Sequence, residues 1–114
     1  MSAPIVFLDI AGPDRASLQT FYSTLFGWDA AAADFAIPVG TPLSASIRED
    51  PAEIRLYIGV DDITAKLEKV QALGGFVDKP RFEVPGVVVL GLFKDPAGNP
   101  MGLVAMEDGA PKVP

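Results

Sequence analysis

The 114-residue sequence predicts a single α+β domain, residues 1–114, in which a strand–helix–strand–strand–strand module occurs twice. Apolar runs of strand length alternate with segments whose apolar residues recur at helical spacing. In addition, a shift of 48 residues places one half of the chain on the other without a gap. The two modules span about residues 4–50 and 53–107, a period that indicates a duplicated half-domain and not a solenoid repeat.

The first module begins with an apolar strand over residues 5–11. Gly12 and Pro13 end this strand, and Asp14 is placed to cap a helix. The helix should end at Gly27, because glycine adopts the positive φ of a helix C-terminus without strain. The apolar stripe of this helix, which we expect in the core, consists of Leu18, Phe21, Tyr22 and Leu25.

The rest of the first module carries weaker signals. Short strands are predicted over residues 34–39 and 43–48, on either side of the turn at residues 40–42. Residues 49–51, Glu-Asp-Pro, form a polar break that we expect to join the two modules.

The shift of 48 residues predicts the second module. It gives a strand over residues 54–60 and a helix that is capped by Asp62 or Thr64 and ends at residues 74–75. A tight turn, Asp-Pro-Ala-Gly-Asn at residues 95–99, precedes the last strand. The further strands are residues 76–84, 87–93 and 101–106, and the coinciding residues are Leu8 with Leu56, Ile10 with Ile58, Asp14 with Asp62, Leu25 with Leu73, and Gly27 with Gly75.

Alternation along the two opening strands assigns their faces. The aliphatic rows should lie under the helices, and they consist of Val6, Leu8 and Ile10 and of Leu56, Ile58 and Val60. The opposite rows mix aromatic, charged and small residues, as the lining of a ligand cavity does. These rows are Phe7, Asp9 and Ala11 in the first strand, and Arg55, Tyr57 and Gly59 in the second.

Composition excludes several kinds of chemistry. The chain has no histidine and no cysteine, which removes a Ser-His-Asp triad, a thiol nucleophile and any His or Cys metal site. A net charge of -6 with scattered basic residues argues against a nucleic-acid partner. No apolar stretch is long enough for a membrane span, and the N-terminus has no secretory signal. We therefore expect a cytoplasmic protein with no membrane partner.

Four motifs make the chain resemble the vicinal-oxygen-chelate superfamily, which includes glyoxalase, bleomycin-resistance proteins and extradiol dioxygenases. They are residues 21–28 (Phe-Tyr-Ser-Thr-Leu-Phe-Gly-Trp), 60–62 (Val-Asp-Asp), 72–75 (Ala-Leu-Gly-Gly) and 95–99. The resemblance implies two βαβββ modules that form a curved mixed sheet around a ligand cleft, with helices on the outer face, and it implies a homodimer. Residues 30–52 are short for this superfamily, which predicts truncation of the later strands of the first module.

Enzymes of this superfamily hold a divalent metal ion with His or Glu on the first strand of each module and Glu on the last strand. The resemblance places these positions at Phe7, Arg55 and Gly102. Phe7 has no donor atom, Arg55 is a cation, and Gly102 has no side chain. The resemblance thus implies the fold, whereas these three departures lead us to expect no metal and no other cofactor.

Asp9 and Arg55 are the charged candidates for a site. Asp9 either contacts the ligand or acts as a base, or it pairs with a cation such as Arg55. Arg55 either grips an anionic ligand with two parallel hydrogen bonds or neutralises Asp9. Tyr57 either orients a ligand through its hydroxyl or packs with its tip in water.

Three hypotheses about function follow. The first is a metal-free protein that binds a small organic molecule, amphipathic and in the first instance cationic, with Gly102 leaving volume for it. The alternative is a metal-independent lyase or isomerase with Asp9 as base and Arg55 as oxyanion stabiliser. The third is an interaction module without a ligand. The expected ligand-binding residues are Phe7, Asp9, Arg55, Tyr57, Gly102 and Val104, continued along the last strand by Met106.

Overall fold

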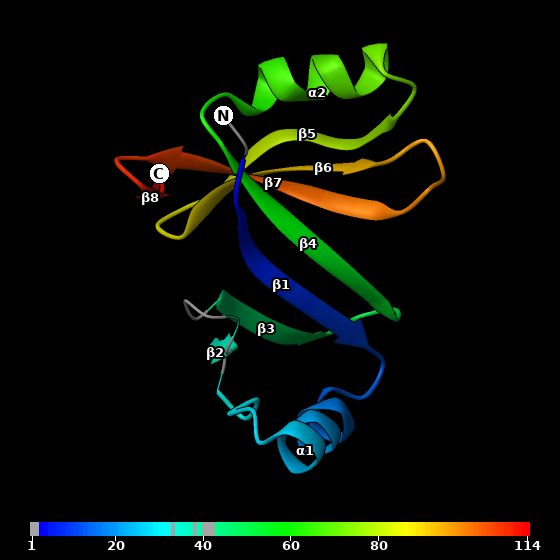
Figure 1. Cartoon of the computed structure of the whole chain (residues 1–114), viewed down its shortest axis with the longest axis vertical. Coiled ribbons are helices and arrows are strands. Elements are labelled where there is room, and N and C mark those ends of the chain that lie inside the picture. Colours follow the sequence, from blue (N-terminus) through cyan, green and yellow to red (C-terminus); the bar gives the residue numbers. More distant parts are fainter. Residues whose placement is uncertain (1–2, 33, 38, 40–42) are drawn as a thin grey trace. The chain divides into compact units, whose positions relative to one another are not determined.

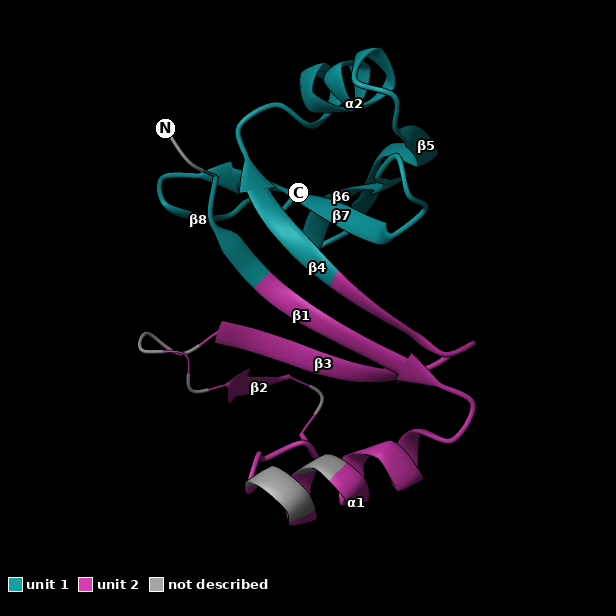
Figure 2. Cartoon of the chain, turned by 45° about the vertical axis from the view of Figure 1, so that its right-hand side comes forward, with its two compact units in different colours: residues 1–6, 56–114 teal, residues 7–55 magenta. Residues whose placement is uncertain are grey.

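The computed structural model describes residues 3–32, 34–37, 39 and 43–114, except for the side chains of residues 22, 25 and 26. The chain divides into two compact units (Figures 1 and 2). Unit 2 comprises residues 7–55, and unit 1 comprises residues 1–6 together with 56–114. The boundaries fall inside two strands, so that each of these strands contributes residues to both units (Figure 2). The predicted turn at residues 40–42 lies outside the described residues.

Unit 2 contains most of β1 (Ile5–Gly12), then α1 (Arg15–Phe26), β2 (Phe35–Ile37) and β3 (Leu43–Glu49). β3 pairs in parallel with β1 and antiparallel with β2. Both predicted ends of α1 are confirmed. The Asp14 carboxylate accepts a hydrogen bond from the Ser17 amide at 3.1 Å, and Gly27 takes the left-handed conformation at φ 72°.

The core of unit 2 packs α1 and the segment after it against one face of its strands. Its buried members are Ile10, Ala30, Phe35, Ile37, Ala45 and Ile47, with Leu8, Leu18, Trp28 and Leu43 packed beside them. The prediction that Phe21 belongs to the core is wrong, because its side chain is 56% exposed. Three residues turn a helix by about 300°, so Phe21 lies to the side of the line through Leu18 that faces the core.

Unit 1 contains most of β4 (Glu53–Val60), then α2 (Ile63–Ala72), β5 (Phe76–Val84), β6 (Val88–Lys94), β7 (Pro100–Glu107) and the short β8 (Ala110–Pro111), which was not predicted. β7 pairs in parallel with β4 and antiparallel with β6 and β8, and β6 pairs antiparallel with β5. Asp62 caps α2 by accepting from the Ala65 amide at 3.0 Å. The mixture of parallel and antiparallel pairs with two helices confirms the α+β class.

The core of unit 1 lies between α2 and its strands; Figure 1 shows α2 beside β5 and β6. Its buried members are Val60, Ile63, Leu67, Val89, Leu103 and Ala105, with Ile58, Val77 and Phe93 packed beside them. Gly91 permits the close approach of the helix, because a Cβ there would lie 2.6 Å from Cγ2 of Ile63. The prediction that Ile58 and Val60 lie under a helix is therefore confirmed.

Val6 departs from the predicted face assignment. Its Cγ1 lies 3.1 Å from the position of a Cβ built at Gly59, in the same space as the Met106 side chain. Gly59 donates its amide hydrogen to Pro4 at 2.9 Å, which brings the start of β1 beside this glycine. Met106 and Val6 together fill the space that the missing side chain of Gly59 leaves.

The turn before β7 forms as predicted. The Asp95 carboxylate accepts from the Ala97 and Asn99 amides at 2.9 Å each and from Asn99 Nδ2 at 2.8 Å, while Gly98 has φ 92°. The Asn99 side chain, followed by its backbone amide, lowers the pKa of Asp95.

Both modules contain a parallel pair formed by their first strand and a later strand, but they differ in the number of strands. β1 lies parallel to β3 with Asp9 opposite Ser46, and β4 lies parallel to β7 with Tyr57 opposite Gly102. In the described residues, two strands follow α1, whereas α2 is followed by β5, β6, β7 and the short β8. No helix in the described part of the chain has the length and apolar character needed to span a membrane.

Candidate functional site

A network of charged side chains joins β1, β3 and the start of β4 within unit 2. We call it the charge cluster, and it consists of Asp9, Ser46, Arg48, Asp50, Glu53 and Arg55. Asp9 is only 2% exposed. Its Oδ1 accepts from Ser46 Oγ at 3.2 Å, and its Oδ2 accepts from Arg48 Nε at 2.5 Å.

Arg48 is the centre of the charge cluster. Besides Asp9, it donates from Nη1 to Asp50 at 2.6 Å and from Nη2 to Glu53 Oε2 at 2.5 Å. Burial opposes its charge, but the hydrogen bond to Asp9 and the charges of the three carboxylates outweigh this and raise the pKa of Arg48.

Arg55 shares Glu53 with Arg48. It is 6% exposed, and it donates from Nε to Glu53 Oε2 at 3.2 Å and from Nη2 to Oε1 at 3.3 Å. The hydrogen bond from Arg55 is the main cause that lowers the pKa of Glu53, and it prevails over the opposing effect of burial. One carboxylate is thus held by two guanidinium groups.

Among the alternatives for Asp9, the structure favours a paired carboxylate, but its cation is Arg48 rather than the expected Arg55. Asp9 and Arg55 do belong to one network, which Arg48 and Glu53 connect. The sequence analysis missed Ser46, Arg48 and Glu53. Alternation would have revealed Ser46 and Arg48, because they alternate with the buried Ala45 and Ile47 along β3, whereas no local pattern marks Glu53.

Tyr57 and Gly102 meet in unit 1, where they lie opposite each other on β4 and β7. A Cβ at position 102 would lie 2.4 Å from both Cδ1 and Cε1 of the Tyr57 ring. The prediction that Gly102 leaves volume for a ligand is therefore wrong, because the ring of Tyr57 covers this glycine. Val104 follows on β7 opposite Gly59 and is 4% exposed.

Phe7 lies on β1 opposite Ser44 and is half-buried. With Arg55 and Gly102 it completes the three positions that the resemblance assigns to metal ligands. These side chains do not fit a metal ion, since Arg55 brings its own positive charge and position 102 is covered by a phenol ring. In the part of the chain that the structure describes, no group of three or more His, Cys, Asp or Glu side chains could hold a metal.

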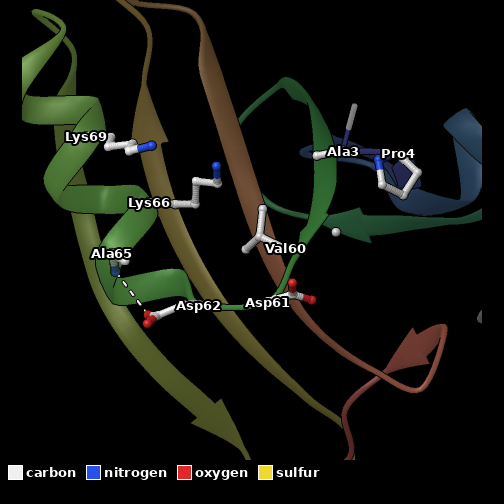
Figure 3. A pocket seen from close by; sticks show the side chains of 9 residues that line it. Ala3, Pro4, Val60, Asp61, Asp62, Ala65, Lys66 and Lys69 are labelled. Atoms are coloured by element: carbon white, nitrogen blue, oxygen red, sulfur yellow. Dashed lines mark hydrogen bonds between the residues drawn. The ribbon is translucent and has the colours of Figure 1, made fainter. Parts of the chain in front are cut away.

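A pocket of about 340 Å³ lies elsewhere in unit 1, between the start of the chain, the end of β4 and α2 (Figure 3). Its charged lining residues are Asp61, Asp62, Lys66 and Lys69, and both lysines extend from α2 (Figure 3). The two charge signs balance, and Asp62 is engaged as the cap of α2. None of the six predicted ligand-binding residues lines this pocket.

The family model described as a glyoxalase-like domain matches residues 5–104. The chain belongs to the glyoxalase-like domain family. This membership and the fold confirm the resemblance to the vicinal-oxygen-chelate superfamily.

Two curated proteins are similar to this chain in sequence. A protein named "Putative glyoxylase CFP32" from Mycobacterium bovis is 28% identical in an alignment 118 positions long, which covers 85% of this chain and 43% of that protein. The protein of the same name from Mycobacterium tuberculosis matches equally. The chain therefore spans less than half the length of these relatives.

Solved structures share the fold at lower sequence identity. A methylmalonyl-CoA epimerase in complex with methylmalonyl-CoA and NH4+ has a TM-score of 0.70 at 14% identity, covering 98% of this chain and 100% of that one. A variant of the Streptomyces coelicolor methylmalonyl-CoA epimerase with 2-nitronate-propionyl-CoA gives the same values, TM-score 0.70, 14%, 98% and 100%. At this identity the likeness concerns the fold alone.

Proposed function

We propose that this glyoxalase-like chain binds a small organic molecule without the help of a metal ion. The observation that carries the proposal is the state of the family's metal positions. Arg55 forms an ion pair with Glu53, and Gly102 lies under the Tyr57 ring. Two of the three positions are therefore taken up by an ion pair and an aromatic ring, and neither offers a metal ligand. The scaffold is kept while the donors are gone, which favours binding over metal-assisted chemistry.

The arrangement of Asp9 supports binding over the lyase or isomerase alternative. A general base must reach the proton that it abstracts. Asp9 is 2% exposed and accepts from both Ser46 and Arg48, so a substrate has little access to either carboxylate oxygen. Asp9 therefore acts as a structural anion that holds Arg48.

We propose that the ligand contacts unit 2, where Arg48 and Arg55 of the charge cluster supply the polar contacts. The similar epimerase structures contain methylmalonyl-CoA or 2-nitronate-propionyl-CoA, and bleomycin-resistance proteins suggest amphipathic cations. A screen should therefore contain acyl-CoA thioesters, free organic acids and cationic antibiotics. We further propose that the chain works as a homodimer, which light scattering in solution tests directly.

Thermal denaturation in the presence of this library tests the proposal. A ligand at 100 times its dissociation constant stabilises the folded state by about 2.7 kcal/mol, which raises the melting temperature measurably. Arg55→Lys should reduce the shift, because lysine lacks the planar fork of arginine. Arg81→Lys is the matched control, since Arg81 also pairs with a glutamate on its own strand but lies in β5.

Two outcomes would contradict the proposal. One is a library that raises the melting temperature of neither the wild type nor the control variant. The other is stoichiometric zinc, iron or manganese in elemental analysis of the purified protein, with loss of ligand binding when the metal is removed.

A further inference from the structure

Two guanidinium groups converge on a single carboxylate in unit 2. Glu53 Oε2 accepts from Arg48 Nη2 at 2.5 Å and from Arg55 Nε at 3.2 Å, while Oε1 accepts from Arg55 Nη2 at 3.3 Å. Arginine forks bind carboxylate and phosphate oxygens in this way when proteins recognise oxyanions. Glu53 therefore occupies a site whose donors suit an external oxyanion.

The two arginines stay in place independently of Glu53. Arg48 is anchored by Asp9 through Nε and by Asp50 through Nη1, so its Nη2 remains aimed at the position of the Glu53 carboxylate. The Arg55 side chain is 7% exposed and is confined by its burial. The donors are thus held by the surrounding structure, which lowers the cost of ordering them when an anion binds.

Glu53 lies at an edge of unit 2 from which its side chain can turn into water. It is the first residue of β4, directly after the exposed bend at residues 51–52, and its side chain is 27% exposed. Rotation about its side-chain bonds would carry the carboxylate into water. An incoming oxyanion would then replace the negative charge that leaves, so the charge of the cluster would not fall.

We propose that Arg48 and Arg55 form an oxyanion clamp, which Glu53 occupies until a ligand with a carboxylate or phosphate group displaces it. This deepens the proposed function, on which its biological use rests, by naming the chemical group that the ligand presents. Glu53 makes the clamp selective, because a ligand must bind the two arginines more strongly than the protein's own carboxylate does.

The first experiment removes the internal occupant with Glu53→Ala and offers formate or inorganic phosphate, at constant ionic strength set with chloride. Isothermal titration should give binding at least about tenfold tighter than for the wild type, a change of about 1.4 kcal/mol. The same anions should raise the melting temperature of Glu53→Ala more than that of the wild type. Glu53→Gln, which keeps the size of the side chain, should show the same direction of change if Glu53→Ala does not fold.

Glu83→Ala is the matched control. Glu83 also pairs with an arginine two residues away on one strand, Arg81 at 3.3 Å, but Arg81 is 41% exposed and forms no clamp with a second arginine in the described residues. This variant should bind formate and phosphate no better than the wild type. Adding Arg55→Lys to Glu53→Ala should abolish the gain, because one fork of the clamp is lost.

Equal anion affinity in the wild type, Glu53→Ala and Glu53→Gln would overturn the clamp. So would an equal gain in Glu83→Ala, because it would show a general effect of net charge. This assay uses formate and phosphate only, so a clamp can be found even when the ligand library fails. Conversely, a library ligand that carries no anionic group would refute the clamp's role and leave the metal-free binding function standing.

Discussion

The two modules place opposite chemistry at the same position of one scaffold. In unit 2, Asp9 lies opposite Ser46 on parallel strands, and Arg48 extends the pair into a network of charges in which Asp9 and Arg55 are buried. In unit 1, the corresponding positions hold Tyr57 opposite Gly102, and an aromatic ring covers the glycine. Both modules pair their first strand in parallel with a later strand. The side chains at the paired positions then determine whether that face of the sheet is polar or covered by a ring.

Removing Arg48 should disrupt the polar pair in unit 2, and we expect it to cause the largest loss of folding stability. Arg48→Ala leaves the Asp9 carboxylate buried at 3% side-chain exposure without its charged partner, which costs about 3 kcal/mol. Urea denaturation of the purified variant measures this loss. Adding Asp9→Asn should recover part of it, because the isolated charge is then gone.

Arg81→Ala serves as the control for Arg48→Ala, because its pair with Glu83 is exposed on both sides. It should change the stability by less than about 0.5 kcal/mol. A loss in Arg48→Ala no greater than in Arg81→Ala would show that the charge cluster does not stabilise unit 2.

The closed half of the comparison is tested by adding a single methyl group. Gly102→Ala places a Cβ 2.4 Å from two ring atoms of Tyr57, so the ring must move, at a cost of about 1–3 kcal/mol. In a double-mutant cycle, Tyr57→Ala should make Gly102→Ala far less costly. Additive effects of the two changes would contradict the contact between ring and glycine.

Ser46→Ala is the counterpart of Gly102→Ala in the other module. It removes the hydroxyl that donates to Asp9 at 3.2 Å, and the expected loss is about 1 kcal/mol. Denaturation curves for Ser46→Ala and Gly102→Ala then compare equivalent positions of the repeat. Because the first loses a hydrogen bond and the second gains a clash, only the second should respond to Tyr57→Ala.

The smallest expected effect is the contribution of Glu53 to the loss of folding stability at acid pH. The pKa of Glu53 is lowered in the folded state by the hydrogen bond from Arg55, so its stabilising contribution is fully present above the unfolded value of about 4.3 and is lost as the pH falls through the folded value. Since Glu53 is partly exposed, this contribution should stay below about 1 kcal/mol. Glu53→Gln should flatten the decline of stability below pH 5, as urea denaturation at several pH values would measure. An unaltered decline in Glu53→Gln would contradict this assignment.

Local signals were sufficient to predict most of the secondary structure. Asp14, Gly27 and Asp62 act on backbone groups a few residues away, so their roles follow from neighbouring sequence. The repeat then predicted β4 and α2 from β1 and α1. Phe21 was misplaced because helical spacing defines a stripe about a third of the helix wide, and only tertiary packing selects its centre.

The side chains of the site were harder to predict than the strands that carry them. Glu53 was not singled out from the sequence, because nothing local reveals that Arg48 and Arg55 both reach it. The absence of a side chain at Gly102 was read as open space, yet a neighbouring strand can fill such space with a ring. Contacts across strands depend on register, which a single sequence specifies only through the pattern of the whole strand.

The Tyr57 ring over Gly102 also limits how a metal centre could be engineered into this chain. Anyone who reinstalls a glutamate at position 102 to rebuild a metal centre will meet the ring first, so the ring must be made smaller beforehand. Phe7 and Arg55 would need replacement as well. The order of these changes matters, because each intermediate variant loses stability before a metal ion can bind and restore it. More than one substitution is therefore needed to build a metal centre at these positions.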